Sequence, residues 1–438
     1  MTSFPQRIME MMLQSQYWPS ADLHAFQRNQ LGQLLKHTYE QSPFYKDRLK
    51  LLFDHNGDID WKRWTDVPVI KRSDLRDHGK EMLAGTLPPL HGPVKEFHTS
   101  GSSGVPISVT YGPIFSAAAQ AARYRAFTWH GIDHSKPRAR LSLDSASGER
   151  LRDDFFLDTW GPFWTPKQTH GREVVINRAL TTARQLQVMV EQQICYLSAF
   201  PNSAELLARV NEGLKQQLKL DCVIAYGQGV SEEQLALFDS SLGAKCMQTY
   251  SSKEGGKIAF KCPEHNNFHI NSETVMLEVL DEQDRPCSFG TPGRIVITPF
   301  YNSAQPLVRY EQGDVGVLGE VCPCGRTLPV LQKILGRVEP IWKFPDGMLI
   351  APRLKHTLLQ EKMHALAYQI AHVAPMALEV RYIPTAKNAK PEEATIQQHI
   401  LEMTRPDITI SFKPMDSLPT NSGGKTQLFT TEVGSLLK

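Results

Sequence analysis

Apolar residues recur at helical spacing through the first part of the chain, and two prolines interrupt the pattern. These prolines lie in Trp18-Pro-Ser20 and in Ser42-Pro-Phe-Tyr45. Proline has no amide hydrogen and fits only the first turn of a helix, so each interruption should end one helix and begin the next. We therefore predict helices over residues 6–53 and a helical N-terminal segment over residues 1–80.

Between residues 114 and 242, helical spacing alternates with short apolar runs that are typical of buried strands. Helices are predicted at Ile114–Trp129, Leu180–Leu197, Ser203–Gln216 and Ser231–Leu242, and strands at Arg138–Leu143 and Leu220–Ala225. The alternation of strand and helix indicates an α/β domain with a parallel or mixed sheet. Ligands of such sheets bind at the carboxyl ends of the strands.

From residue 258 onward, short strands and polar turns replace the helical spacing. The predicted strands are Phe268–Ile270, Val275–Leu280, Arg294–Thr298, Leu307–Tyr310 and Val315–Leu318, in a β-rich subdomain over about residues 258–335. A further unit follows, with helices predicted at Pro352–Gln360 and Glu392–Glu402. The expected fold class is α/β, with a large domain over residues 1–335 and a small α+β domain over residues 336–438.

The composition describes a soluble globular protein, since 41% of the residues are hydrophobic and 21% are charged. A formal net charge of +2 gives no electrostatic reason to expect a nucleic-acid partner. The N-terminus lacks a basic-then-apolar signal pattern and no apolar run is long enough to span a bilayer, so we expect a cytoplasmic protein without a membrane partner. Seven cysteines, without regular spacing over most of the chain, argue against a disulfide framework.

A loop rich in serine and glycine lies between two strand-like segments, Val94–Phe97 and Ile107–Tyr111. From His98 to Ser108 the chain carries five hydroxyl side chains and two glycines in eleven residues. Glycine lets backbone amides approach a phosphate closely and hydroxyls add donors without bulk, so the loop suits a polyanion. Its composition also fits a flexible connector. A Walker-type phosphate loop is excluded, because no Gly-Lys-Ser/Thr enters a helix here.

Two short cysteine motifs suggest a metal site. Cys262-Pro-Glu-His265 and Cys322-Pro-Cys324 lie about sixty residues apart and offer three thiolates and one imidazole. This is the ligand number of a closed, tetrahedral Zn²⁺ site, with His269 as the alternative nitrogen ligand. A closed site has no open position for a substrate, so its role would be to hold two loops together. Three reduced thiols near the surface are the other interpretation.

Four short motifs follow the serine-glycine loop in a set order. They are Tyr250-Ser-Ser-Lys-Glu254, Tyr310-Glu-Gln-Gly-Asp314, Gly336-Arg337 and the C-terminal loop that carries Lys425. In this order the motifs resemble the adenylate-forming superfamily of acyl-CoA synthetases, and most closely its phenylacetate-CoA ligase and capsule-biosynthesis branch. The resemblance covers nearly the whole chain, and its further pieces are Ser42–Tyr45, Val67–Leu75, Pro306–Tyr310 and Cys322–Gly325.

The resemblance implies a binding site for ATP. The implied residues are Thr99, Ser100, Gly101, Ser102, Ser103 and Gly104 around the phosphates, Gly227, Gln228, Gly229, Tyr250 and Ser251 around the adenine, and Asp314 and Arg337 around the ribose or its phosphate. An aromatic ring can stack on adenine, and the two oxygens of one carboxylate fit the two ribose hydroxyls. Taken singly, each motif could also be a plain turn.

Two residues are the implied catalytic groups. Glu254 would ligate Mg²⁺, and Lys425 would bridge the substrate carboxylate and the nucleotide when the C-terminal domain closes as a mobile lid. Expulsion of pyrophosphate passes through a transition state crowded with negative charge, which needs such cations. The chain departs from the family pattern at three positions: Ile107 stands in place of a loop lysine, Lys253 in place of threonine or serine, and Glu339 in place of the hinge aspartate.

The function implied by the resemblance is ATP-dependent activation of a carboxylic acid as an acyl-adenylate, followed by transfer to coenzyme A. An aryl or arylacetic acid is the implied small-molecule substrate, and ATP, Mg²⁺, coenzyme A and a structural Zn²⁺ are the implied cofactors. A homodimer is compatible with this function, and the sequence does not decide the oligomeric state. Amide formation, nucleotidyl transfer to another acceptor, and a decayed homologue that only binds nucleotide stay open. Retention of Glu254, Asp314 and Lys425 together argues against decay.

Overall fold

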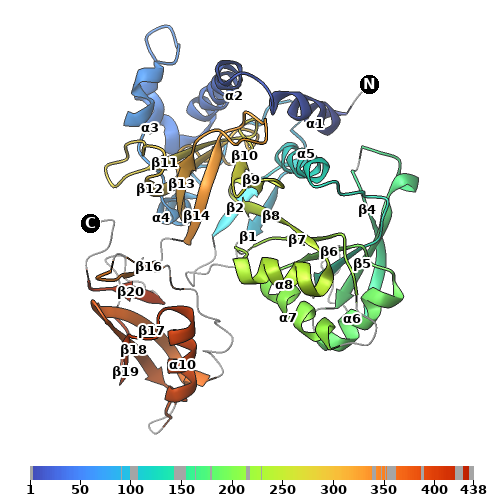
Figure 1. Cartoon of the computed structure of the whole chain (residues 1–438). Coiled ribbons are helices and arrows are strands. Elements are labelled where there is room, and N and C mark those ends of the chain that lie inside the picture. Colours follow the sequence, from blue (N-terminus) through green and yellow to red (C-terminus); the bar gives the residue numbers. More distant parts are fainter. Residues whose placement is uncertain are drawn as a thin grey trace.

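A mixed sheet of twelve strands runs through the computed structural model (Figure 1). From one edge to the other, its strands are β11 (Val275–Leu280), β12 (Pro292–Pro299), β13 (Tyr310–Gly319), β14 (Val330–Arg337), β10 (Phe268–Ile270), β9 (Gly256–Lys261), β8 (Lys245–Ser252), β7 (Cys222–Ala225), β6 (Tyr196–Ala199), β3 (Arg138–Ser142), β5 (Gly171–Asn177) and β4 (Phe155–Trp160). The structure describes residues 3–89, 91–98, 107–142, 154–162, 164–177, 180–213, 218–227, 229–337, 342–346, 348–350, 352, 362–385, 389–419 and 428–433. The predicted α/β class and mixed sheet are confirmed.

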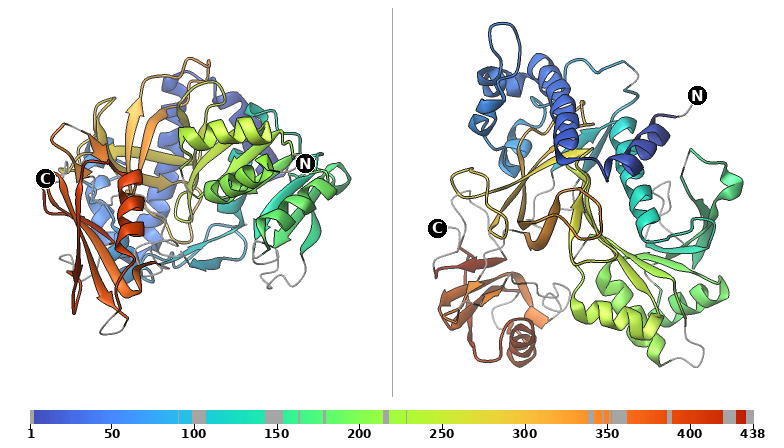
Figure 2. Two further views of the ribbon diagram at one scale, coloured as in Figure 1. Left: turned by 60° about the horizontal axis from the view of Figure 1, so that its bottom comes forward. Right: turned by 45° about the horizontal axis from the view of Figure 1, so that its top comes forward.

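One half of the sheet is parallel and alternates with helices. Strands β5, β3, β6, β7 and β8 run parallel, and β4 adds an antiparallel edge. Helices α6 (Thr182–Glu191), α7 (Pro201–Glu212) and α8 (Glu232–Leu242) lie together along this half (Figure 2). The Ser231 hydroxyl accepts a hydrogen bond from the Gln234 amide and caps α8. The carboxyl ends of these strands therefore lie at one edge, where α/β sheets bind ligands.

The helix predicted over residues 180–197 was too long. It ends at Glu191, and Leu197 lies in the buried strand β6. Gln193 has a φ of 52°, a left-handed conformation that an α-helix cannot continue through. The apolar run therefore supplies both a helix and a strand, which periodicity alone does not separate.

The other half of the sheet is antiparallel and corresponds to the predicted β-rich region. It is not a separate sheet, because β8 pairs with β7 in parallel and with β9 in antiparallel fashion. Helix α5 (Pro113–Trp129) packs against β9 and against α1 (Phe4–Ser15). The strand predicted at residues 307–310 begins only at Tyr310, the first residue of β13.

The N-terminal helices cover the antiparallel half. They are α1, α2 (Ser20–Gln41), α3 (Lys46–Leu49) and α4 (Arg72–His78), with short 3-10 turns at Pro43–Tyr45, Lys50–Leu52 and Trp61–Asp66; a fourth 3-10 turn lies at Lys167–Thr169. Ile70 lies between α3 and α4. Its amide donates to the Arg309 carbonyl, and its carbonyl accepts from the Glu311 amide, both over 2.9 Å. These bonds fix the start of α4 beside β13.

The serine-glycine loop is flanked by a two-stranded hairpin, as predicted. Strand β1 (Lys95–His98) pairs antiparallel with β2 (Ser108–Tyr111), and His98 lies opposite Ser108. The Phe97 and Tyr111 rings stack with centroids 4.1 Å apart. The loop between the paired residues lies outside the described part of the chain, apart from the buried Ile107.

The C-terminal unit has its own sheet and its own core. Its elements are β15 (Trp342–Lys343), β16 (Leu349–Ile350), β17 (Ala365–Ala374), β18 (Ala377–Pro384), α10 (Glu393–Met403), β19 (Thr409–Pro414) and β20 (Phe429–Thr431). Its four-stranded sheet has the order β19-β18-β17-β20. Trp342, Ile370, Val380 and Ile396 lie in its core. In Figure 1 this unit lies below the end of β14, and the boundary at residues 335 and 336 stays a prediction.

The two helices predicted in this unit have different outcomes. The helix predicted at residues 392–402 is α10. Most of the other predicted helix, residues 353–360, lies outside the described part of the chain.

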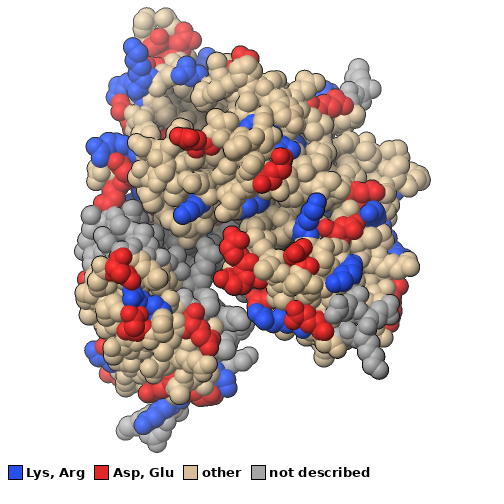
Figure 3. Space-filling model, viewed as in Figure 1, with Lys and Arg blue, Asp and Glu red and all other residues tan. Residues whose placement is uncertain are grey.

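On the face seen in Figure 3, Lys and Arg side chains are interspersed with Asp and Glu. None of the helices in the described ranges is long and apolar enough to cross a membrane.

Candidate functional site

Tyr250 and Asp314 are in contact, although they come from motifs 64 residues apart. Tyr250 lies near the carboxyl end of β8, and Asp314 lies within β13. The Tyr250 hydroxyl donates a hydrogen bond to Asp314 Oδ2 over 2.7 Å, and both side chains are partly buried. Arg337, the last residue of β14, is the register partner of Asp314. The sheet therefore brings three predicted nucleotide-binding positions to one region.

The glycine before Asp314 is required by the backbone. Gly313 has a φ of 77°, which L side chains rarely adopt, and a Cβ there would meet no atom within 4 Å. Conformation rather than crowding thus selects glycine at this position. The ladder between β13 and β14 also shifts register just beyond Asp314, between Val315 and Gly316. Asp314 therefore stands at an irregular point of the sheet, where side chains are re-aimed.

Glu254 is a buried residue of the turn between β8 and β9. The Gly255 amide donates to the Ser252 hydroxyl over 2.8 Å, which tightens this turn. The Glu254 carboxylate lies 3.8 Å from Nη1 of Arg72, and its side chain is only 9% exposed. Sequence reasoning did not assign Arg72 to the site, because nothing in the pattern of α4 links it to a residue so far along the chain. The structure thus adds one cation to the predicted site.

One carboxylate suits the Mg²⁺ ion that ATP chemistry implies. Mg²⁺ takes oxygen ligands, keeps several waters, and usually needs only one or two protein carboxylates beside phosphate oxygens. Glu254 can supply one such oxygen. Arg72 can orient that carboxylate, because the two side chains lie at ion-pair distance.

The predicted adenine-edge segment follows β7, directly beside β8. Gly227 has a φ of 77°, and a Cβ there would lie 2.6 Å from a ring carbon of Phe200. Both conformation and crowding therefore demand glycine. Gly229 is described without regular structure, and Gln228 lies outside the described residues. Ser251 is partly buried and pairs in register with Lys257 of β9.

Several predicted site residues cannot be placed, since they lie outside the described part of the chain. These are Thr99, Ser100, Gly101, Ser102, Ser103, Gly104, Gln228, Glu339 and Lys425. Their roles stay predictions. The backbone of Arg337 is described through its pairing with β13.

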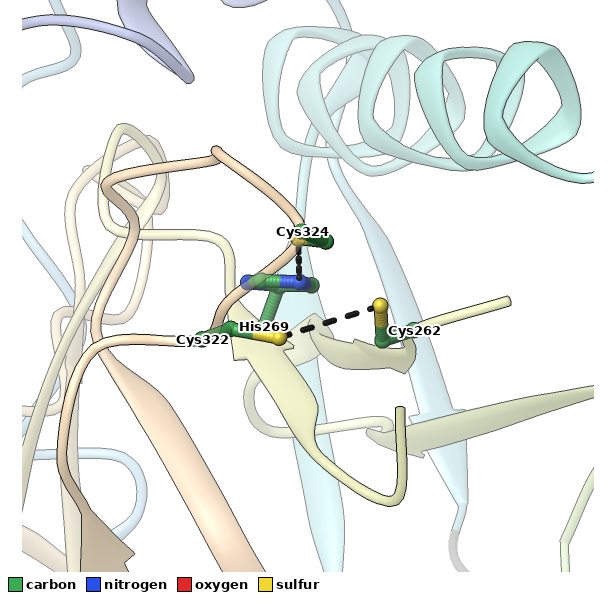
Figure 4. A group of neighbouring side chains, drawn as sticks. All are labelled: Cys262, His269, Cys322 and Cys324. Atoms are coloured by element: carbon green, nitrogen blue, oxygen red, sulfur yellow. Dashed lines mark hydrogen bonds between the residues drawn. The ribbon is translucent and has the colours of Figure 1, made fainter. Parts of the chain in front are cut away.

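Three cysteines and one histidine form a compact cluster (Figure 4). The potential ligand atoms of Cys262, His269, Cys322 and Cys324 all lie within 4.8 Å of one another. Sγ of Cys322 lies 3.9 Å from Sγ of Cys262, and Sγ of Cys324 lies 3.3 Å from Nε2 of His269. Three sulfurs and one imidazole nitrogen are the donor set of a closed tetrahedral zinc site.

The histidine in this cluster is His269, the alternative nitrogen ligand of the sequence analysis, and His265 is not one of the clustered residues. His265 lies in the turn between β9 and β10, which closes where the Cys262 amide donates to the Asn267 carbonyl over 2.8 Å. His269 lies on β10, opposite Phe260 of β9 and Val330 of β14, and is fully buried. Pairing on both sides directs His269 toward the cysteines, whereas short sequence spacing had favoured the residue in the turn.

Burial favours the neutral forms of His269 and Cys262 in this cluster. Burial lowers the pKa of His269 to about 4, so its imidazole is neutral near pH 7 and can ligate a metal. Burial raises the pKa of the Cys262 thiol to about 11. A divalent cation would reverse that effect, because it deprotonates a coordinating thiol.

Two curated proteins are similar to the chain over about three quarters of its length. No protein-family model matches the chain. The chain is 27% identical over 332 residues to a phenylacetate-coenzyme A ligase of Thermus thermophilus, covering 73% of this chain and 72% of that protein. It is 23% identical over 346 residues to a phenylacetate-coenzyme A ligase of Escherichia coli, covering 75% of this chain and 72% of that protein.

Solved structures share the fold. A 2-hydroxyisobutyryl-CoA ligase in the postadenylation state, in complex with R3-HIB-AMP, aligns with a TM-score of 0.66 at 19% identity, covering 95% of this chain and 91% of the other. The same ligase with 2-HIB-AMP and CoA, in the thioesterification state, aligns with a TM-score of 0.63 at 19% identity and covers 96% and 94% of the two chains. The likeness extends over both the twelve-stranded sheet and the C-terminal unit.

Proposed function

Because the chain is a homologue of the phenylacetate-coenzyme A ligases within the adenylate-forming superfamily, we propose that it activates a carboxylic acid with ATP and transfers the acyl group to coenzyme A. The first half-reaction joins the carboxylate oxygen to the α-phosphorus of ATP and releases pyrophosphate. In the second, the thiol sulfur attacks the acyl carbon, AMP leaves, and the thiol proton is lost to solvent or a base. An aryl or arylacetic acid is the proposed substrate class, supported by the two phenylacetate-CoA ligase relatives.

The observation that carries this proposal is the contact between Tyr250 and Asp314 at the end of β8 and in β13. The Tyr250 ring can stack on adenine, and the Asp314 carboxylate can accept hydrogen bonds from ribose hydroxyls. The two can serve one nucleoside only if they lie close together. The hydrogen bond of 2.7 Å between the two side chains supports this proposal, because one ligand could then contact both. The Gly227 turn, at the end of the neighbouring strand β7, can border the adenine from the other side.

The remaining groups act on the charged parts of ATP. Glu254 would hold Mg²⁺, which shields the phosphate charge that develops as pyrophosphate leaves. The amides and hydroxyls of residues 99–104 would hold the β- and γ-phosphates, and Arg337 would contact the ribose or its phosphate. Lys425 would bridge the carboxylate and the nucleotide, carried by residues 336–438 as a lid that rotates between the half-reactions.

The cysteine cluster is proposed to hold one structural Zn²⁺. The donor set and its closeness support this, since four ligand atoms lie within 4.8 Å of one another. Cys322 and Cys324 lie on the connection between β13 and β14, and Cys262 and His269 flank the turn between β9 and β10. A closed site at this place joins two connections of the antiparallel half and takes no part in the reaction.

Pyrophosphate exchange tests the first half-reaction. The full chain would be incubated with ATP, Mg²⁺, labelled pyrophosphate and one acid at a time from a panel of aryl, arylacetic and short aliphatic acids. Label should enter ATP only when a suitable acid is present, and thioester should form when coenzyme A is added. Exchange without thioester would point to another acceptor. Absence of exchange with every acid, in protein that still binds ATP, would overturn the proposal.

A further inference from the structure

Arg309, the residue just before β13, is fully buried in a backbone conformation that residues other than glycine rarely adopt. Its φ is 53°, and of the four described residues other than glycine with a positive φ, Arg309 alone is buried. Its amide donates to the Thr298 hydroxyl over 2.9 Å, which holds this conformation from the neighbouring strand β12. A strained conformation persists only where its surroundings hold it, and such residues gather at functional sites.

The Arg309 guanidinium holds residues 65–67, which precede α4. Nη1 donates to the Val67 carbonyl over 2.6 Å and to the Thr65 carbonyl over 3.0 Å. Nε and Nη2 donate to the two carboxylate oxygens of Glu278, on β11, over 3.2 and 3.3 Å. A planar guanidinium can make both sets of bonds at once, whereas a lysine ammonium cannot reproduce this fork. Arg309 thus fastens residues 65–67 to the sheet.

Arg309 also stands between two parts of the proposed nucleotide site. Its carbonyl accepts a hydrogen bond from the Ile70 amide over 2.9 Å. Two residues after Ile70, Nη1 of Arg72 lies 3.8 Å from Oε1 of Glu254. In the other direction, β13 begins at the residue after Arg309 and carries Asp314. Short stretches of chain therefore connect Arg309 to the ion pair of the proposed Mg²⁺ ligand and to the proposed ribose acceptor.

We propose that Arg309 is a positioning residue that sets the spacing between Glu254 and Asp314 in the nucleotide site. This inference rests on the proposed function. The Arg309 side chain is fully buried and bonded within the protein, so it acts through its neighbours and not on a ligand. Adenylation needs the Mg²⁺ ion and the ribose in a fixed relation, because a displacement of about 1 Å in the reacting geometry can cost about 10²-fold in rate.

Arg309→Lys in the full chain tests this role, since it keeps the charge and removes the fork. Calorimetric titration with ATP gives the Kd and the number of sites, and pyrophosphate exchange at saturating ATP gives the rate per site. The rate per site should fall about 10²-fold, whereas the Kd for ATP should rise only about tenfold, because Asp314 is still present. A purely structural role would lower the number of sites and leave the Kd and the rate per site as in wild type, which would overturn the inference.

Arg125→Lys is the matched control, because Arg125 on α5 forms another fully buried ion pair, with Glu273. Its guanidinium also donates to the Asn271 side chain and the Met12 carbonyl, and none of these partners belongs to residues 65–72 or to β13. Arg125→Lys should lower the melting temperature, as Arg309→Lys does, and keep the wild-type rate per site and Kd for ATP. An equal loss of rate per site in both variants would overturn the inference.

Glu278→Gln decides the question if Arg309→Lys does not fold. It keeps the size of the side chain and one acceptor oxygen, and it removes the charge that pairs with Arg309. The rate per site should then fall about tenfold, the scale of one weakened charge-assisted hydrogen bond. A folded Glu278→Gln protein with the wild-type rate per site would count against the positioning role.

ATP titration separates this inference from the proposed function. If no acid supported pyrophosphate exchange, the proposed function would fail, yet ATP binding would still decide the role of Arg309. Weaker binding in Arg309→Lys with a full number of sites would support the role, and wild-type affinity would overturn it. If wild-type protein bound no ATP, both proposals would fail together.

Discussion

The Tyr250 hydroxyl and Oδ2 of Asp314 lie 2.7 Å apart, joining the end of β8 to the middle of β13 across the antiparallel half of the sheet. Strands β9, β10 and β14 separate β8 from β13 in the sheet order, so only the curvature and twist of the sheet can bring these side chains together. The pair defines a place where one ligand can meet an aromatic ring and a carboxylate.

Asp314→Ala should weaken ATP binding by about 10- to 100-fold, because two ribose hydroxyls would lose a charged acceptor. Tyr250→Phe keeps the ring and removes only the hydroxyl, so its effect should be smaller, about tenfold or less. Calorimetric titration with ATP measures both. Asp158→Ala, on the exposed edge strand β4, is the control and should bind ATP as wild type does. Unchanged affinity in Asp314→Ala would reduce the Gly-Asp motif to a turn.

Glu254→Gln should raise the Mg²⁺ concentration that gives half-maximal pyrophosphate exchange, because the amide is a weaker ligand than the carboxylate. We expect exchange at fixed, limiting Mg²⁺ to fall by about 10²-fold or more. A Mg²⁺ titration of the exchange rate measures this, with Glu233→Gln on the first turn of α8 as the control. If the Mg²⁺ dependence is unchanged, Glu254 serves only its ion pair with Arg72.

Substituting His269 and His265 one at a time tests the proposed zinc site. Protein purified without chelator should contain about one Zn²⁺ per chain. His269→Ala should lose the metal and lower the melting temperature, because the site loses its nitrogen ligand. His265→Ala should keep the bound metal and the wild-type melting temperature, since His265 does not belong to the cluster. Elemental analysis and thermal unfolding measure the two effects, and zinc retained in His269→Ala together with Cys322→Ser would rule out the site.

Lys425→Ala should separate the half-reactions. Loss of one cation at the transition state of adenylation should reduce pyrophosphate exchange by about 10²- to 10³-fold. Conversion of a supplied acyl-adenylate to thioester should remain nearly intact, because the proposed lid has by then rotated Lys425 away. Rapid-quench assays of each step measure the two rates. Equal losses in both steps would contradict the moving lid.

The lowered pKa of Lys257 predicts a pH dependence of stability. Burial, followed by Arg123, lowers this pKa from 10.5 to about 8 in the folded chain. Between these values the unfolded chain binds more protons than the folded chain, so this group should make the free energy of unfolding rise with pH from about 8 to 10.5. Below about pH 8 its destabilising effect is fully present. Denaturant unfolding of wild type and Lys257→Met across this range should show the rise only in wild type.

The sequence by itself determined most of the local structure and the identity of the chemical groups. Proline at Ser42–Tyr45 ends α2, the Ser231 cap begins α8, and apolar runs mark most strands, because these signals act within a few residues. The order of short motifs carried the resemblance to the adenylate-forming superfamily, since each motif is contiguous in the chain. The cysteine spacing indicated a metal site for the same reason.

Only the tertiary structure decided which residues meet. His269 rather than His265 joins the cysteines because β10 is paired on both sides, and strand pairing between distant segments is not encoded in spacing. Arg72 reaches Glu254 because Ile70 is bonded to β13. The apolar run near Leu197 is a strand because the parallel sheet buries it. Long-range packing overrides local pattern wherever burial contributes more free energy than local preference does.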